Sequence, residues 1–137
     1  MTTTTSPIPE GFHTVTPFLI VRDIEQAIAF YKTAFTATEL NRYVDDDNRL
    51  KNVELKIGDS PIMVSQHETV EVNEDRTLNN LPVISIYLYV EDADQLFQQA
   101  IATGARELYP VQLQSYGNRE GAVADPFGNF WWIGTKV

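Results

Sequence analysis

The sequence predicts an α+β domain built from two copies of one unit, in which a strand and a helix are followed by three short strands. The segment Val21–Ala27 is similar to Val90–Leu96, which lies 69 residues further along the chain. An apolar run typical of a strand precedes each segment, at residues 15–21 and 84–90, and an amphipathic helical pattern follows each one. Turn residues then separate three short apolar segments in both halves of the chain.

Both predicted helices begin with the same capping pattern and present one apolar face. Asp23 and Asp92 can accept hydrogen bonds from the free N–H groups of the first turn, and Gln26 and Gln95 follow three residues later, as in a capping box. The first helix repeats apolar residues at helical spacing, at Ile24, Ala27, Ile28, Tyr31, Ala34 and Phe35. The second repeats them at Ala93, Leu96, Phe97, Ala100 and Ile101, and Gly104 predicts its end.

Three short strands are expected after each helix. In the first half they span about residues 38–44, 50–57 and 61–66. In the second half they span about residues 106–113, 120–125 and 129–135. Clusters of Asp, Asn, Gly, Ser and Pro between these segments supply the turns.

The domain organisation follows from these elements. The two βαβββ modules are expected at residues 12–66 and 82–135, within a single domain that spans 12–137. Residues 67–81 are acidic and polar and are predicted to be a connecting loop. Residues 1–11 are rich in threonine, contain two prolines, and are predicted to form a flexible arm.

Composition excludes several classes of function. The chain of 137 residues contains no cysteine, which rules out disulfides, iron–sulfur clusters and thiolate chemistry. Its net charge of −9 makes it acidic, argues against nucleic acid as a partner, and favours a neutral or cationic small molecule. It has neither an export signal nor an apolar stretch of the ~20 residues that a membrane-spanning helix needs. We therefore expect a cytoplasmic protein without membrane contact.

Several motifs resemble those of one superfamily in their order and spacing. They are Pro9–Pro17, Ala27–Tyr31, Val53–Ser60, Leu88–Asp92, Tyr116–Gly121 and Asp125–Trp131. Together they resemble the vicinal oxygen chelate superfamily, and within it the PhnB-like branch of the glyoxalase/bleomycin resistance protein/dioxygenase family. The resemblance implies that two βαβββ modules form an open curved barrel with the helices outside. It also implies a homodimer with ligand cavities at or near its interface.

The resemblance also allows a test for metal binding. Metal-dependent members hold their ion at four cavity-facing positions, which in this chain are Thr16, Met63, Ser85 and Trp132. None of these side chains is a strong ligand for a divalent cation. We therefore expect neither a metal nor another cofactor. The two histidines, His13 and His67, are expected at the surface.

Without a metal, the expected cavity is lined by aromatic side chains. Because side chains alternate along a strand, Phe18, Tyr87 and Tyr89 are expected to face the cavity together with Trp132, whereas Trp131 faces away. Such rings can stack on a planar ligand or contact a cation, although they can also simply fill a core. The predicted ligand-binding residues are Thr16, Phe18, Met63, Ser85, Tyr87, Tyr89, Arg119 and Trp132.

Two charged residues extend this hypothesis. Glu54 lies on the polar face of its strand, in Asn52–Leu55, where PhnB-like relatives typically have His-Ala-Glu-Leu, and it is the candidate catalytic residue. Arg119 is expected to bind an anionic ligand group, to pair with Glu54, or to lie at the surface.

The leading functional prediction is a metal-independent protein that binds a small, drug-like or cationic aromatic molecule and performs no chemistry. One alternative is a metal-dependent glyoxalase- or dioxygenase-type enzyme with a relocated site that uses Glu54 and His13. A second is a metal-free enzyme in which Glu54 acts as the general base.

Overall fold

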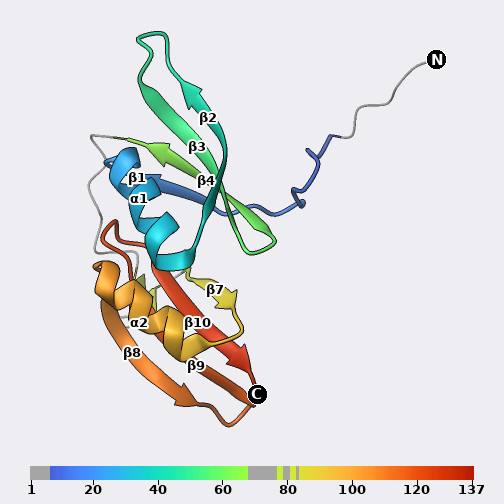
Figure 1. The fold of residues 1–137 in the computed structure, drawn as a ribbon, viewed down its shortest axis with the longest axis vertical. Helices are drawn as coiled ribbons and strands as arrows, with labels where there is room; N and C mark the ends of the chain where they lie inside the picture. The colour runs from blue at the N-terminus through green and yellow to red at the C-terminus, as the bar shows by residue number, and fades with distance from the viewer. Residues whose placement is uncertain (1–6, 68–76, 79–80, 83) are drawn as a thin grey trace, which may run out of the picture.

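The computed structural model describes residues 7–67, 77–78, 81–82 and 84–137, and it contains both predicted modules (Figure 1). The first module consists of β1 (Phe18–Val21), α1 (Ile24–Phe35), β2 (Thr38–Val44), β3 (Leu50–Ile57) and β4 (Ser60–Gln66). The second consists of β7 (Ile86–Tyr89), α2 (Ala93–Thr103), β8 (Arg106–Leu113), β9 (Asn118–Ala124) and β10 (Phe130–Lys136). The α+β prediction of two βαβββ modules is therefore confirmed.

Each module forms its own four-stranded sheet. The strand orders are β1-β4-β3-β2 and β7-β10-β9-β8, and neither sheet closes on itself. In each sheet the first strand runs parallel to the last, and the remaining pairs are antiparallel. Phe18 lies opposite Met63, and Tyr87 lies opposite Trp132, so the 69-residue repeat extends to the register of the strands.

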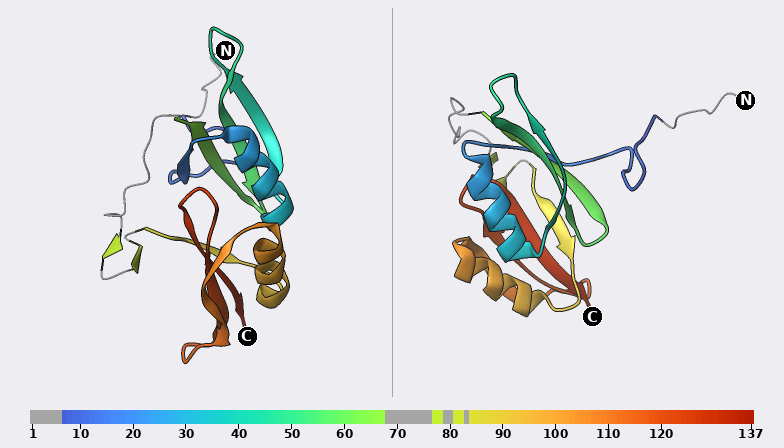
Figure 2. Two further views of the ribbon diagram at one scale, coloured as in Figure 1. Left: turned by 90° about the vertical axis from the view of Figure 1, so that its left-hand side faces the viewer. Right: turned by 45° about the horizontal axis from the view of Figure 1, so that its top comes forward.

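The two helices lie side by side and cover the same side of the molecule (Figure 2). Gln99 of α2 joins them, because its side-chain amide donates to the carbonyl oxygens of Thr33 and Ala34 at 2.7 and 3.0 Å. Beneath the helices the fully buried Trp131 packs against Phe35, with ring centroids 4.7 Å apart. The core therefore sits between the helices and one face of each sheet.

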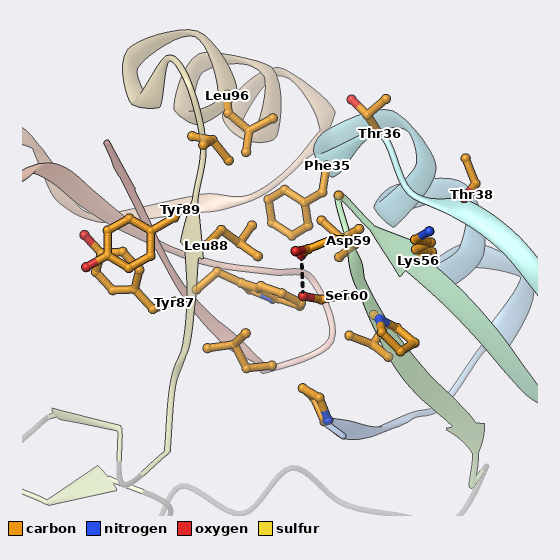
Figure 3. Close-up of a pocket in the computed structure, with 18 of the residues that line it drawn as sticks. Phe35, Thr36, Thr38, Lys56, Asp59, Ser60, Tyr87, Leu88, Tyr89 and Leu96 are labelled. Carbon is orange, nitrogen blue, oxygen red and sulfur yellow. Dashed lines mark hydrogen bonds between the residues drawn. The ribbon is translucent and has the colours of Figure 1, made fainter. Parts of the chain in front are cut away.

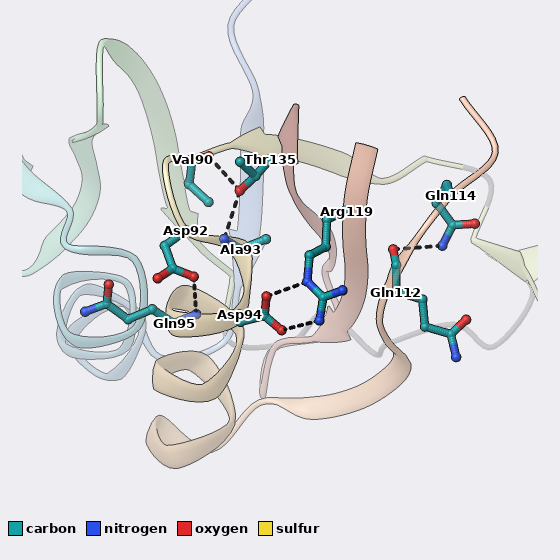
Figure 4. Close-up of polar contacts among 9 residues, drawn as sticks. All are labelled: Val90, Asp92, Ala93, Asp94, Gln95, Gln112, Gln114, Arg119 and Thr135. Carbon is teal, nitrogen blue, oxygen red and sulfur yellow. Dashed lines mark hydrogen bonds and ion pairs between the residues drawn. The ribbon is translucent and has the colours of Figure 1, made fainter. Parts of the chain in front are cut away.

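The predicted caps are present in both helices. Asp23 and Asp92 accept hydrogen bonds from the backbone N–H three residues later, at 3.2 and 3.1 Å. The first amide of α1 donates to Gln66 Oε1 at 2.8 Å, and the first amide of α2 donates to Thr135 Oγ1 at 2.9 Å (Figure 4). Gln66 and Thr135 are again 69 residues apart, so the last strand of each module holds the start of its helix.

Some boundaries differ from the prediction. The first strand of each module begins later than expected, at Phe18 and Ile86, and Val15 and Ile84, which were expected within these strands, are 84% and 81% exposed. Pro17 contributes to this difference in the first module because it has no N–H to donate; its carbonyl alone joins the sheet, accepting from Met63 N at 2.9 Å.

Residues 1–11 were predicted to be a flexible arm, and residues 67–81 a connecting loop. Residues 1–6 of the arm and residues 68–76 and 79–80 of the loop lie outside the described part of the chain. Within the loop, β5 (Thr77–Leu78) pairs with β6 (Leu81–Pro82), a short antiparallel contact that the sequence did not indicate. In the part of the chain that is described, neither helix has the length and apolar character needed to cross a bilayer.

Candidate functional site

The predicted site residues lie mostly on the face of each sheet that is turned away from its helix, which we call the open face. In the first sheet Phe18, Met63 and Glu54 occupy neighbouring strands in one row. In the second sheet the equivalent row is Tyr87, Trp132 and Ala122. Because side chains alternate, the residues between them in sequence pack toward the helices.

Trp132 forms an aromatic stack on the open face of the second sheet. Its ring lies 5.4 Å from that of Tyr109, with 9° between the planes. The two residues flank Ala122 in the strand register, so a small side chain between them leaves room for the rings to meet. Tyr109 is 43% exposed and Trp132 is partly buried, so the stack is accessible from solvent.

The side chain of Tyr87 extends across β10 and reaches the buried carboxylate of Glu120. Its hydroxyl donates to Glu120 Oε1 at 2.7 Å, and Glu120 is only 5% exposed. The strand between them carries Gly134, and a methyl group at that position would lie 1.9 Å from the Tyr87 hydroxyl oxygen. The contact between Tyr87 and Glu120 therefore depends on a glycine at position 134.

Further tyrosines complete this group, which we call the tyrosine cluster: Tyr87, Tyr89, Tyr116, Asn118 and Glu120. The Tyr116 hydroxyl donates to Glu120 Oε2, so both carboxylate oxygens are occupied. The Asn118 amide donates to the hydroxyl oxygens of Tyr87 and Tyr89, each at 3.1 Å. Burial and the hydrogen bond to Glu120 raise the pKa of Tyr87 to about 12. The pKa of Tyr116 is also raised, chiefly by its hydrogen bond to Glu120, so both phenols remain neutral donors near pH 7.

The first sheet contains a second buried carboxylate with a different arrangement. Glu54 is 9% exposed, and its Oε1 accepts from Asn41 Nδ2 at 2.7 Å and from the Tyr43 hydroxyl at 3.0 Å. The hydrogen bond to Glu54 raises the pKa of Tyr43. Among the described residues, Oε2 of Glu54 accepts no hydrogen bond.

A cavity of about 790 Å³ lies between the two modules (Figure 3). Its walls come from the end of α1, the β3–β4 turn, strand β7 and α2, and include Phe35, Lys56, Asp59, Leu88 and Leu96. Of the predicted ligand-binding residues, only Tyr87 and Tyr89 line it. The other six do not line it, although Lys56, which shares the open face of β3 with Glu54, does.

Arg119 lies on the helix side of the second sheet. Its guanidinium group binds both carboxylate oxygens of Asp94, in the first turn of α2, at 2.6 and 3.0 Å (Figure 4). The pairing with Glu54 that the sequence left open is therefore not formed. Arg119 and its neighbour Glu120 lie on opposite faces of the sheet, because adjacent residues of a strand point to opposite faces.

The four positions equivalent to those that hold metal in metal-dependent members have other contacts or lack ligating groups. Thr16 donates its hydroxyl to the carbonyl oxygen of His13 at 3.3 Å, and Trp132 stacks on Tyr109. Met63 and Ser85 offer no carboxylate or imidazole either, so the set does not fit a divalent cation. In the described part of the chain, no three His, Asp or Glu side chains lie close enough to hold a metal ion.

Sequence reasoning missed most of the polar residues of these sites. Glu120, Tyr116 and Asn118 were noted only as parts of a motif, and Asn41 and Tyr43 were not singled out. The alternation of side chains along β9 is a signal for Glu120, because it places Glu120 on the same face as Ala122 and on the opposite face from Arg119. The role of Gly134 is visible only once Tyr87 is placed beside it.

Comparisons with known proteins agree with this architecture. A model of the Glyoxalase/Bleomycin resistance protein/Dioxygenase superfamily matches residues 11–133. An uncharacterised protein of Mycobacterium bovis is 37% identical over 127 residues, which cover 90% of this chain and 83% of that protein. An uncharacterised protein of Mycobacterium tuberculosis is equally similar, with 74% of its length covered.

Known structures share the fold at low sequence identity. TioX from Micromonospora sp. ML1 is 22% identical with a TM-score of 0.69, over 91% of this chain and 97% of TioX. The fosfomycin resistance protein FosX from Listeria monocytogenes is 16% identical with a TM-score of 0.69, over 91% and 93% of the two chains. The PhnB protein from Bacillus cereus is 18% identical with a TM-score of 0.65, over 90% and 99%.

Proposed function

Because the chain belongs to the glyoxalase/bleomycin resistance protein/dioxygenase superfamily, we propose that it is a metal-independent small-molecule-binding protein of that family, acting as a cytoplasmic homodimer. The ligand is a planar aromatic compound, and a cationic one is favoured. It lies on the open faces of the sheets, where the aromatic side chains gather.

The accessible Trp132–Tyr109 stack is the observation that carries this proposal. Two large rings lie parallel at the surface of a sheet, where solvent reaches them. Tyrosine and tryptophan offer a ligand both ring contact and a polar atom, which is why they are frequent at binding surfaces. An apolar wall with a few fixed polar groups is the usual form of a small-molecule site.

Charge supports the preference for a cation. The chain carries a net charge of −9, and two buried carboxylates, Glu54 and Glu120, lie on the open faces. The net charge attracts cations over long range and speeds their encounter with the protein, an effect that salt screens. A cation above an indole or phenol ring gains about 0.5–2 kcal/mol.

The proposal is tested by screening cationic aromatic compounds and glycopeptide drugs for thermal stabilisation of the protein and for quenching of tryptophan fluorescence. For any compound that binds, we expect Trp132→Ala to weaken binding by at least about tenfold. Leu113→Ala is the matched control, because Leu113 is also large and 63% exposed but lies opposite Arg119, on the other face of the same sheet. Unchanged binding to the Trp132→Ala variant, or no binding across the panel, argues against the proposal.

A second candidate function is favoured by the open oxygen of Glu54. A carboxylate with one oxygen fixed and the other free can accept a proton from a bound substrate, so a metal-free enzyme with Glu54 as general base is the alternative. Mass spectrometry of each bound compound, before and after incubation with the protein, separates the two functions. Conversion that is abolished in Glu54→Gln supports the enzyme, and unchanged compound supports the binding protein.

A further inference from the structure

We propose that Glu54 receives a positively charged nitrogen of the ligand, an ammonium or amidinium group, through its open oxygen Oε2. This inference rests on the proposed small-molecule function and assigns the anionic contact within it. The carboxylate is 9% exposed, and Oε1 is held by Asn41 and Tyr43 at 2.7 and 3.0 Å. The side chain is therefore fixed in one orientation before any ligand arrives.

The open oxygen is accessible to solvent. Among the described residues, no buried side-chain nitrogen or oxygen atom lacks a hydrogen-bond partner. Oε2 of Glu54 has no such partner in that part of the chain, so it must lie at the accessible surface of the open face. The described ion pairs involve Glu25, Glu39 and Asp94, and none of them reaches Glu54.

The surroundings of Glu54 make a charged donor the best complement. Its neighbours in the same row are Met63 and, beyond it, Phe18, neither of which can donate a hydrogen bond to the carboxylate. Lys56 shares this face of β3, but the described ion pairs do not join it to Glu54. An accessible carboxylate oxygen that accepts no hydrogen bond from the described residues is complemented most strongly by a cationic donor. The exposed ring of Tyr43 adds a face on which the same cation can lie.

Glu120 cannot take the same role. Both of its oxygens already accept hydrogen bonds from phenols of the tyrosine cluster. The position equivalent to Glu54 in the second sheet is Ala122, which lies beneath the Trp132–Tyr109 stack. The two sheets therefore differ in what they offer: the first provides an anion and the second provides aromatic rings.

The test compares two probes that differ mainly in charge, tryptamine and its neutral alcohol analogue tryptophol, by isothermal titration calorimetry. Glu54→Gln is the informative variant, since its amide oxygen keeps the bonds from Asn41 and Tyr43 while an NH₂ group replaces the open oxygen. We expect tryptamine to bind the wild type more tightly than tryptophol. We expect the variant to weaken tryptamine about ten- to hundredfold and to leave tryptophol nearly unchanged.

Glu107→Gln is the control for net charge, because Glu107 is exposed on β8 and the substitution removes the same unit of charge. Equal losses in the Glu54 and Glu107 variants, equal binding of the two probes, or no binding of tryptamine to the wild type overturns the assignment of Glu54. These results leave the proposed function standing as long as other aromatic compounds bind in a Trp132-dependent manner. Unfolding by urea checks that both variants remain folded.

Discussion

At the scale of single residues, small side chains in the central strands decide which larger ones can meet. Gly134 lies between Tyr87 and Glu120, and Ala122 lies between Trp132 and Tyr109. In both cases the side chains of the flanking strands close over the small residue. The open face of the second sheet therefore depends on residues that take no direct part in its polar contacts.

We expect Gly134→Ala to destabilise the protein by about 1–3 kcal/mol, because the added methyl group displaces the Tyr87 ring. Urea denaturation measures this loss of unfolding free energy. In a Tyr87→Ala background the same substitution should cost less than about 0.5 kcal/mol, since its steric partner is gone. Equal costs in both backgrounds would show that the clash with Tyr87 is not the cause.

The pH dependence of Tyr87 provides a second prediction at this scale. The fold raises the pKa of Tyr87 from 10.0 to about 12, so the folded protein holds the phenolic proton more tightly than the unfolded chain does. The resulting stabilisation is complete below pH 10 and is lost as the pH rises toward 12. In an alkaline titration, the phenolate absorbance of the wild type should rise in a step near pH 12, and this step should be absent in Tyr87→Phe. Loss of a step near pH 10 instead would contradict the structure.

At the scale of elements, the two helices are held by the same contacts in the same places. Each begins at a capping aspartate, and each donates its first amide to a residue of the last strand of its own module. The C-terminal ends of the two helices differ. Helix α1 ends at Thr36, which adopts a left-handed φ of 59°, whereas α2 ends at Gly104 with a φ of 119°. A left-handed conformation is costly for a β-branched residue such as Thr36 and easy for glycine.

We expect Asp23→Ala and Asp92→Ala each to lower the unfolding free energy by about 1 kcal/mol, because each removes the same kind of cap. Asp46→Ala is the control, since Asp46 is an exposed turn residue between β2 and β3. Its effect should stay within about 0.5 kcal/mol. Losses that differ widely between the two caps would argue against equivalent roles for the two helices.

At the scale of the whole molecule, two open sheets leave apolar surface without cover. The repeat-equivalent residues Val15 and Ile84 are 84% and 81% exposed, and Phe18 and Tyr89 are 54% and 69% exposed. Contiguous apolar patches larger than a few hundred Å² are uncommon on monomers. Association of two copies is the simplest way to cover them.

We therefore predict that the protein is a dimer at micromolar concentration, measured by light scattering coupled to gel filtration. The double variant Val15→Asp, Ile84→Asp should shift the mass toward the monomer, because charges would then lie in the interface. Val137→Asp is the control, since Val137 is comparably exposed, at 78%, but stands at the C-terminus. A monomeric wild type would refute the prediction.

The sequence predicted the fold well because the signals for it are local and occur twice. Helical spacing and the capping aspartates Asp23 and Asp92 depend on neighbours within a few residues. The 69-residue repeat then related the two modules and correctly matched Phe18 with Tyr87 and Met63 with Trp132. Each of these features can be read without knowing what lies across the sheet.

Only the tertiary structure decided which polar groups meet. The Tyr87–Glu120 hydrogen bond spans 33 residues of sequence and exists because Gly134 leaves space between two strands. Arg119 binds Asp94 on α2. Glu54 accepts a hydrogen bond from Asn41 at Oε1, and its Oε2 accepts none from the described residues. The Tyr87–Glu120 contact depends on the register of three strands at once and on the volume of the side chain between them. Strand periodicity assigns a face to each residue but does not identify its partner.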